Sequence, residues 1–275
     1  MDALEGRIRE LAAEAGAASI AVACWPVAAP APLVVIDGDR ALHAASTMKL
    51  AVLVELHRRV AAGDLALGDP MTVRNAFASI VDASPFRLDP ADDSETALYA
   101  REGDAVPMAD LAELMITVSS NLATNLLVDR LGPARITATM AGLGLDGIVV
   151  RRGVEDGPAF DAGLNNTVTA LDLARLLVLL GRGEVISAGA TAAMLEVLEA
   201  QQFNEGIPTG LPAGTPVAHK TGSIRRLYHD AALVRPQGAA AYALVVLTTG
   251  LDEERDGPAL VSRIAAACHE RLSER

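Results

Sequence analysis

The chain has 275 residues, a length typical of one large domain or two closely packed ones. Hydrophobic residues make up 51% of the chain and charged residues 21%, and no apolar run approaches the roughly 18 residues that span a bilayer, so we expect a soluble globular protein. The formal net charge of −12 would repel a phosphate backbone or an anionic membrane surface, which argues against nucleic acid as a partner.

The first residues favour an amphipathic helix. Leu4, Ile8, Leu11 and Ala15 recur at helical intervals with acidic residues among them. A secretory signal peptide would instead begin with basic residues and continue into an apolar stretch of about 7 to 15 residues. We therefore expect a cytoplasmic protein, or a periplasmic or secreted one whose leader has been trimmed.

The next segments are a strand, a turn and a second strand, followed by a long helix. Apolar runs predict strands at 19–27 and 33–36, with prolines between them. Apolar residues at helical spacing then predict a helix that begins at Ser46 and ends near Gly63, where a glycine cap is expected.

The middle of the chain is helical apart from one loop-rich stretch. The segment between Asn75 and Pro107 contains Pro85, Pro90 and the acidic run Asp92-Asp93-Ser94-Glu95, and we expect it to form solvated surface. Helical periodicity predicts the following helices: 111–118, 122–127 and 170–180. Residues 165–167, with the sequence Asn-Asn-Thr, could cap the last of these helices or form a turn that leads into it.

The last third returns to strand character and ends in a helix. The predicted elements are strands at 217–224, 229–234 and 241–248 and a helix at 258–272. The predicted fold class is therefore α/β (α+β): an antiparallel sheet built from both chain ends and flanked by helices, with an inserted all-helical lobe. We expect residues 1–48 and 185–275 to form one discontinuous domain, residues 49–184 the other, and the active site to lie in the cleft between them.

The two cysteines lie near opposite ends of the chain. Cys24 and Cys268 lack the spacing that a metal site requires. Cys268 shares a helical stripe with Leu260 and Ile264, so we expect buried thiols rather than a disulfide.

One candidate for chemistry is the segment Ser46-Thr47-Met48-Lys49. Three residues are about one helical turn, so the Ser46 hydroxyl and the Lys49 amine share a face. A serine hydroxyl needs a nearby base to act as a nucleophile. Lysine serves as that base only where burial or other cations disfavour its charge.

Two further polar motifs follow later in the chain. Ser119-Ser120-Asn121 lies at a junction between two predicted helices, where Ser119 and Asn121 can converge only if the junction is a loop or cap. Lys220-Thr221-Gly222-Ser223 lies in a predicted strand. There Gly222 would let a substrate lie close to the backbone, and Lys220 could hold an anionic group.

The three motifs together are far more specific than each alone. In this order, SxxK, SxN and KTG resemble the active-site set of class A β-lactamases and penicillin-binding proteins. The resemblance extends to MITVSSNLATNLL around the second motif and to AHKTGS at the third. It covers most of the chain and implies a β-lactamase/transpeptidase-like fold.

The resemblance implies roles for these residues. Ser46 would be the acylated nucleophile and Lys49 its proton acceptor or relay. Ser119 would pass a proton to the leaving nitrogen, and Asn121 would bind the acyl amide carbonyl.

The third motif would bind and polarise the substrate. Lys220 and Thr221 would hold the substrate carboxylate. The backbone N–H groups of Ser46 and Ser223 would form the oxyanion hole, whose contribution is usually the largest electrostatic one in acyl transfer.

The chain departs from the family pattern at two places. The usual S-D-N reads S-S-N, so Ser120 replaces an acid, and we expect a repacked junction. The segment with the carboxylate that activates the deacylating water is also altered. Glu155 is our first choice for that role, Asp161, four residues before Asn165, is the rival, and a third possibility is that neither serves.

Other polar residues are weaker candidates. Arg225 follows the third motif closely enough to meet a substrate carboxylate, although a solvated hairpin tip is the simpler interpretation. His43 and the pair His229-Asp230 would suggest a Ser-His-Asp system, but no GxSxG elbow accompanies them.

We therefore expect a serine β-lactamase that opens β-lactams through a Ser46 acyl-enzyme. We expect it to need no cofactor or metal, to act on a small β-lactam or related acyl substrate, and to be a monomer. Two alternatives stay open. One is an esterase, amidase or peptidase of the same fold with a non-lactam substrate, and the other is a penicillin-binding sensor that deacylates slowly.

Overall fold

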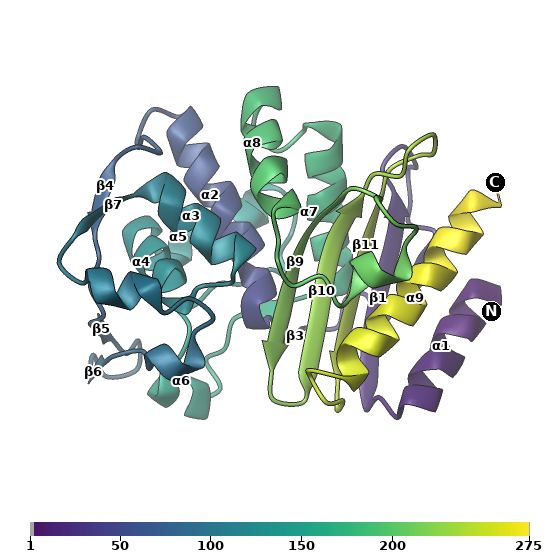
Figure 1. Cartoon of the computed structure of the whole chain (residues 1–275), viewed down its shortest axis with the longest axis horizontal. Coiled ribbons are helices and arrows are strands. Elements are labelled where there is room, and N and C mark those ends of the chain that lie inside the picture. The colour runs from purple at the N-terminus through teal and green to yellow at the C-terminus, as the bar shows by residue number, and fades with distance from the viewer. Residues whose placement is uncertain (1–2, 275) are drawn as a thin grey trace.

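A five-stranded antiparallel sheet lies at the centre of one half of the molecule (Figure 1). The computed structural model describes residues 3–274. The strands, in spatial order, are β2 (Val34–Ile36), β1 (Ser19–Pro26), β11 (Tyr242–Thr249), β10 (Leu227–Val234) and β9 (Val217–Ile224). The first strand of the chain thus pairs with the last, in register from Ser19 opposite Thr249 to Pro26 opposite Tyr242.

The central strands are apolar because both faces of the sheet are covered. Side chains along β10 and β11 are almost all buried, which explains their near-continuous apolar sequence. The outer face packs against α1 (Ala3–Ala15) and α9 (Asp256–Ser273), seen in purple and yellow in Figure 1. The inner face packs against α7 (Ala170–Arg182).

The other half of the molecule is helical. Its α-helices are α2 (Lys49–Ala61), α3 (Met108–Thr117), α4 (Asn121–Leu131), α5 (Pro133–Gly142), α6 (Gly157–Asp161) and α8 (Ala188–Glu199). Residues Lys49 to His57 of α2 are all buried, because this helix runs through the middle of the apolar cluster. The helical half and the inner sheet face share that cluster, so the two halves are packed as one body.

Short strand pairs and 3-10 helices connect these longer elements. The paired strands are β3 (Leu42–His43) with β8 (Thr167–Val168), β4 (Pro70–Thr72) with β7 (Ala105–Pro107), and β5 (Phe77–Ala78) with β6 (Pro85–Phe86). The 3-10 helices are η1 (Ala45–Met48), η2 (Pro90–Asp92), η3 (Ala97–Arg101) and η4 (Ile207–Gly210). Of these, η1 and η2 border the site described below.

The predicted fold class is confirmed, and several details differ. The helix predicted to begin at Ser46 starts with the 3-10 turn η1 and becomes α-helical at Lys49. The helices α5 and α8 were not predicted, although Pro133 in the first turn of α5 and the Ser187 cap of α8 are typical start signals.

Two local predictions were wrong. The cap of α7 is Thr169, whose side chain accepts a hydrogen bond from the Asp172 N–H, and not residues 165–167. Within the acidic run at 92–95, Asp93 is only 8% exposed and is not solvated surface. Its interior contacts are described with the site.

The remaining sequence-level expectations concern the cysteines and membrane spans. Cys24 and Cys268 are both buried and free, on β1 and α9. Within residues 3–274, no helix has the length and apolar character needed to cross a bilayer.

Candidate active site

Ser46 lies on η1, at the boundary between the sheet and the helical half. In a 3-10 helix residues i and i+3 are eclipsed, so Ser46 and Lys49 are stacked along one side. Strand β9 runs directly beneath: a Cβ added to Gly222 would come within 3.0 Å of the Ser46 backbone nitrogen. Glycine at this position therefore lets the strand approach the nucleophile segment more closely than a residue with a Cβ could without a local shift.

The Lys49 amine is buried and bound to the second motif. Its Nζ donates to the Ser119 carbonyl oxygen at 2.7 Å, to Ser119 Oγ at 3.1 Å and to Asn121 Oδ1 at 3.1 Å. Burial lowers the pKa of Lys49 to about 7, with the negative charges of Asp93 and Glu155 opposing the shift. At neutral pH a large fraction of this amine is therefore uncharged and able to accept a proton.

The SxN junction is an irregular turn between α3 and α4. Ser119 has a φ of 57°, a left-handed conformation that is uncommon for a residue other than glycine and costs backbone energy. This turn directs both the Ser119 carbonyl and its hydroxyl at Lys49. Asn121, the first residue of α4, reaches the same amine, so the junction brings Ser119 and Asn121 together as predicted.

Glu155 approaches from the loop between α5 and α6. Asn121 Nδ2 donates to Glu155 Oε1 at 2.6 Å, so the asparagine bridges Lys49 and Glu155. Partial desolvation raises the pKa of Glu155 to about 6, while the Asn121 hydrogen bond opposes the rise. The carboxyl group is therefore mostly ionised at pH 7 and becomes protonated in mildly acidic solution.

The rival residues lie farther along the chain, in and after α6. Asp161, at the end of α6, is exposed and lines the cleft. Asn165 Oδ1 accepts a hydrogen bond from Arg152 and serves to hold the loop. Of the two acids, Glu155 is the one bonded to the second motif.

The loop of Glu155 is fixed by residues that the sequence analysis did not single out. Asn125, one turn along α4 from Asn121, donates to the Val154 carbonyl at 3.0 Å and accepts from the Val154 N–H at 2.6 Å. The buried Asp156 accepts from Ser79 Oγ at 2.7 Å and caps α6. Such contacts hold Glu155 in its left-handed conformation, with a φ of 61°.

The third motif occupies the middle of β9. Lys220 is completely buried and its Nζ donates to the Thr221 carbonyl oxygen at 2.9 Å. Burial, followed by the positive charge of Lys49, lowers the pKa of Lys220 well below its usual value, while Asp230 opposes the shift. The two lysines therefore disfavour each other's charge.

These groups surround a single cleft of about 1080 Å³. The predicted site residues along its wall are Ser46, Ser119, Asn121, Glu155, Asp161, Thr221, Ser223 and Arg225. The apolar side chains Phe160, Phe203 and Ile224 also border it. The cleft is large enough for a drug-sized molecule.

The histidines do not build a Ser-His-Asp system. His229 is buried, accepts from the Thr248 N–H at 3.1 Å and contacts the His43 carbonyl oxygen at 3.0 Å, and burial lowers its pKa to about 4. Asp230 pairs with His219 at 2.9 Å instead. His43 accepts from the Ala45 N–H at 3.0 Å and so supports the turn that carries Ser46.

The residue that the sequence analysis most clearly missed is Asp93. Its Oδ2 accepts from the Asn121 N–H and the Leu122 N–H, each at 2.9 Å, and from the Tyr99 hydroxyl at 2.9 Å. Ser120 Oγ lies 3.4 Å from the same oxygen. The junction that contains Ser120 is thus held by a carboxylate from a distant loop.

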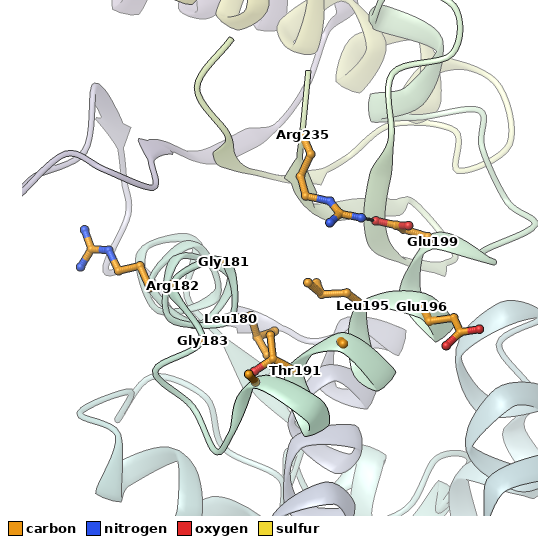
Figure 2. Close-up of a pocket in the computed structure, with 11 residues that line it drawn as sticks. Leu180, Gly181, Arg182, Gly183, Thr191, Leu195, Glu196, Glu199 and Arg235 are labelled. Atoms are coloured by element: carbon orange, nitrogen blue, oxygen red, sulfur yellow. Dashed lines mark ion pairs between the residues drawn. The ribbon is translucent and has the colours of Figure 1, made fainter. Parts of the chain in front are cut away.

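A second hollow lies away from these groups. It measures about 430 Å³ and lies between α7 and α8, with the Arg235–Glu199 ion pair across one side (Figure 2). None of the predicted site residues lines it. Within residues 3–274, no three His, Cys, Asp or Glu side chains gather as a metal site would require.

Solved structures with the same architecture include penicillin-binding and lactam-cleaving proteins. PBP-A has a TM-score of 0.86 and 25% identity, with 100% of this chain and 97% of that chain covered. A PBP-A variant, determined as an acyl-enzyme complex with penicillin G, has a TM-score of 0.85 and 26% identity, covering 99% of this chain and 97% of that one.

A β-lactamase from Sphaerobacter thermophilus is similarly close. It has a TM-score of 0.83 and 25% identity over 98% of this chain and 97% of that chain. Comparison with curated protein sequences gave no match. The fold and these similarities define the chain as a β-lactamase-like serine hydrolase.

The family assignment rests on nearly the whole chain. The model of the β-lactamase enzyme family matches residues 3–272. The protein therefore belongs to this family, and the resemblance found in the three motifs is confirmed.

Proposed function

We propose that the protein is a serine β-lactamase that hydrolyses the lactam amide through an ester on Ser46. The observation that carries this proposal is the position of the Lys49 amine, which is buried, has a pKa of about 7 and is bonded to Ser119 and Asn121. A base with such a pKa suits proton transfer at neutral pH.

Acylation would begin with attack of Ser46 Oγ on the lactam carbonyl carbon. The hydroxyl proton would pass to Lys49, and the backbone N–H groups of Ser46 and Ser223 would stabilise the negative oxygen of the tetrahedral intermediate. The ring C–N bond would then break, and the proton held by Lys49 would reach the leaving nitrogen through Ser119 Oγ, 3.1 Å from Nζ. Serine is thereby acylated and the base is regenerated.

Substrate would be held from both sides of the cleft. Thr221 on β9 and the exposed Arg225, which both line the cleft, would bind a carboxylate, and the buried Lys220 would support Thr221 through its carbonyl oxygen. Asn121 would bind the acyl amide carbonyl across the cleft. Gly222 would keep β9 close enough to Ser46 for both halves to contact one small molecule.

Deacylation would use a water molecule activated by Glu155. The carboxylate would accept a proton from water as the water oxygen attacks the ester carbonyl carbon. The ester C–O bond to Ser46 would then break, and the proton held by Glu155 would return to Ser46 Oγ, which regenerates both groups. The hydrogen bond between Asn121 and Glu155 supports this choice over Asp161. A pKa of about 6 leaves Glu155 ionised, as a base must be, near pH 7.

The test is turnover of the chromogenic cephalosporin nitrocefin. The wild-type chain should hydrolyse it, and Ser46→Ala should reduce the rate to background while keeping the circular dichroism and melting temperature of the wild type. Turnover by Ser46→Ala at the wild-type rate would refute the proposal.

A slowly deacylating penicillin-binding protein is the second candidate, and the acyl-enzyme complex of the similar PBP-A variant favours it. Intact-mass spectra after mixing with penicillin G separate the two. A transient mass increase supports hydrolysis, whereas a stoichiometric adduct that persists for hours supports binding. Turnover of p-nitrophenyl esters without any nitrocefin or penicillin reaction would instead indicate an esterase with a non-lactam substrate.

A further inference from the structure

The carboxylate of Asp93 occupies the positive end of α4. The first turn of a helix has backbone N–H groups without partners inside the helix, and its partial positive charge favours an anion. Asp93 takes the N–H groups of Asn121 and Leu122, and the Ser120 hydroxyl takes that of Ala123 at 3.2 Å. A serine alone at position 120 would leave two of these three donors without their acceptor.

The helix held in this way carries the contacts of the candidate site. Asn121 touches both Lys49 and Glu155, and Asn125 clamps the backbone of Val154 next to Glu155. Ser119, the residue with left-handed backbone, directly precedes this turn. A shift of the first turn of α4 would therefore displace the partners of Lys49 and Glu155 together.

Asp93 is also a negative charge that acts on Lys49. The charged groups that face Lys49 are Asp93, Glu155 and Lys220, from the loop at 89–95, the loop before α6 and β9. Asp93 is the larger of the two influences that raise the pKa of Lys49, and it also raises the pKa of Glu155. The groups that interact with Asp93 itself are the Tyr99 hydroxyl, Lys49 and Glu155.

We propose that Asp93, which belongs to none of the three motifs, is a positioning residue for acyl transfer: it anchors the first turn of α4 and sets the charge balance around Lys49. It acts through Lys49, Asn121 and Glu155 and not by touching substrate. This inference rests on the proposed function for its substrate, and on the hydrogen bonds of Asp93 alone for the anchoring of α4.

The direction of the expected pH effect follows from the sign of the charge. Asp93 favours the ammonium form of Lys49 and the neutral form of Glu155, so removing its charge lowers the pKa of both groups. Both bases are then free at lower pH. The acidic limb of the pH profile of kcat/KM should therefore move to lower pH when residue 93 is uncharged.

The test compares Asp93→Asn with the wild type over pH 4.5 to 9, using kcat/KM for nitrocefin and for a p-nitrophenyl ester. We expect the acidic limb to move down by about half a pH unit or more and kcat/KM at the optimum to fall about tenfold. Asp93→Glu keeps the charge, so its limb should stay at the wild-type pH even if its rate is lower.

Asp92→Asn is the matched control. Asp92 is the adjacent exposed acid, and it influences Glu155 less than Asp93 does. The Asp92→Asn variant should keep the acidic limb of the pH profile, which depends on Lys49, at the wild-type pH. An Asp93→Asn profile that overlays the wild type, or that loses height without moving, would overturn the proposal.

Further variants and the second substrate distinguish a failure to fold, or a wrong substrate, from the role of Asp93. If Asp93→Asn does not fold, Asp93→Ser, which keeps a neutral oxygen acceptor, takes its place. Failure of both neutral variants to fold would assign Asp93 to stability alone and would also overturn the proposal. A wild-type chain that cleaves the ester and not nitrocefin would refute the proposed substrate, while the ester profile would still decide the role of Asp93.

Discussion

The two walls of the cleft are built in different ways. The sheet wall, β9 from Lys220 to Ser223, is one regular strand whose residues are placed by paired hydrogen bonds to β10. The helical wall gathers Lys49, Ser119 and Glu155 from three separate segments, two of them with left-handed backbone, and joins them by side-chain hydrogen bonds. The sheet wall is therefore a rigid surface, whereas the helical wall is a network in which each member depends on the others.

Three of the residues with left-handed backbone lie in the helical wall or at its rim. Ser119, Glu155 and Ala45 all have positive φ, and each adjoins a group with a proposed role. Backbone strain of this kind persists where the surroundings determine it, here through Asn125, Asp156 and His43. The comparison predicts that changes in the helical wall alter proton transfer, whereas changes in the sheet wall alter geometry and stability.

The largest effect within the helical wall should come from Glu155→Gln. The amide keeps the hydrogen-bond partner Asn121 but cannot accept a proton, so kcat should fall by about 1000-fold and the Ser46 ester should accumulate. In the wild type, deacylation should decline as the pH falls through about 6, because the carboxyl group becomes protonated. Stopped-flow turnover and intact mass measure both quantities.

Asp161→Asn is the control for that variant, because Asp161 lines the same cleft from α6. It should retain wild-type turnover. Accumulation of ester by Asp161→Asn, with rapid turnover by Glu155→Gln, would transfer the role to Asp161.

In the sheet wall, Gly222→Ala should have the next largest effect. The new Cβ would lie 3.0 Å from the Ser46 nitrogen and 3.1 Å from the Thr47 nitrogen, which forces β9 and η1 apart. We expect kcat/KM to fall up to about 100-fold through misplacement of the reacting groups, and stability to fall by about 1 to 3 kcal/mol through overpacking. Nitrocefin kinetics and urea unfolding are the measurements.

Gly189→Ala on α8 is the matched glycine variant. An added Cβ there meets nothing within 4 Å, and alanine is the better helix former. Activity should be unchanged and stability equal or slightly higher. Equal losses of kcat/KM and of stability in Gly222→Ala and Gly189→Ala would mean that the close approach of β9 to Ser46 does not determine activity.

The smallest effect on activity, but a clear one on stability, concerns His229 behind the sheet wall. Its pKa is about 4 in the folded chain, against about 6.5 for free histidine, so the unfolded chain binds a proton first as the pH falls. His229 therefore has little effect on the free energy of unfolding above pH 6.5 and should lower it by about 3 kcal/mol at pH 4. His229→Gln should flatten the dependence of unfolding free energy on pH between these values, and an unchanged slope would contradict the burial argument.

The sequence was sufficient for the parts of the site that are local. SxxK places its two groups on one turn, and the KTGS residues share one strand, so spacing alone predicted their relation. The strands of the main sheet were also predicted from local sequence, because the apolar runs near both chain ends are typical of strands that are buried on both faces of a sheet. The α5 and α8 helices were missed although Pro133 and Ser187 mark their starts.

Only the tertiary structure decided which distant groups meet. Asp93 lies in a loop whose composition is that of solvated surface, and its burial depends on the N-terminus of α4 arriving beside it. The contact of Asn121 with Glu155 and the clamp of Asn125 on Val154 likewise join segments far apart in the chain.

What the sequence by itself determined is therefore the main sheet, most of the long helices and the chemical groups available, since these follow from periodicity and from spacing within one turn or one strand. What the fold decided is the proton affinity of those groups. Lys49 and Glu155 have shifted pKa values because of desolvation and of charges brought near them by packing, and neither quantity is written in local sequence.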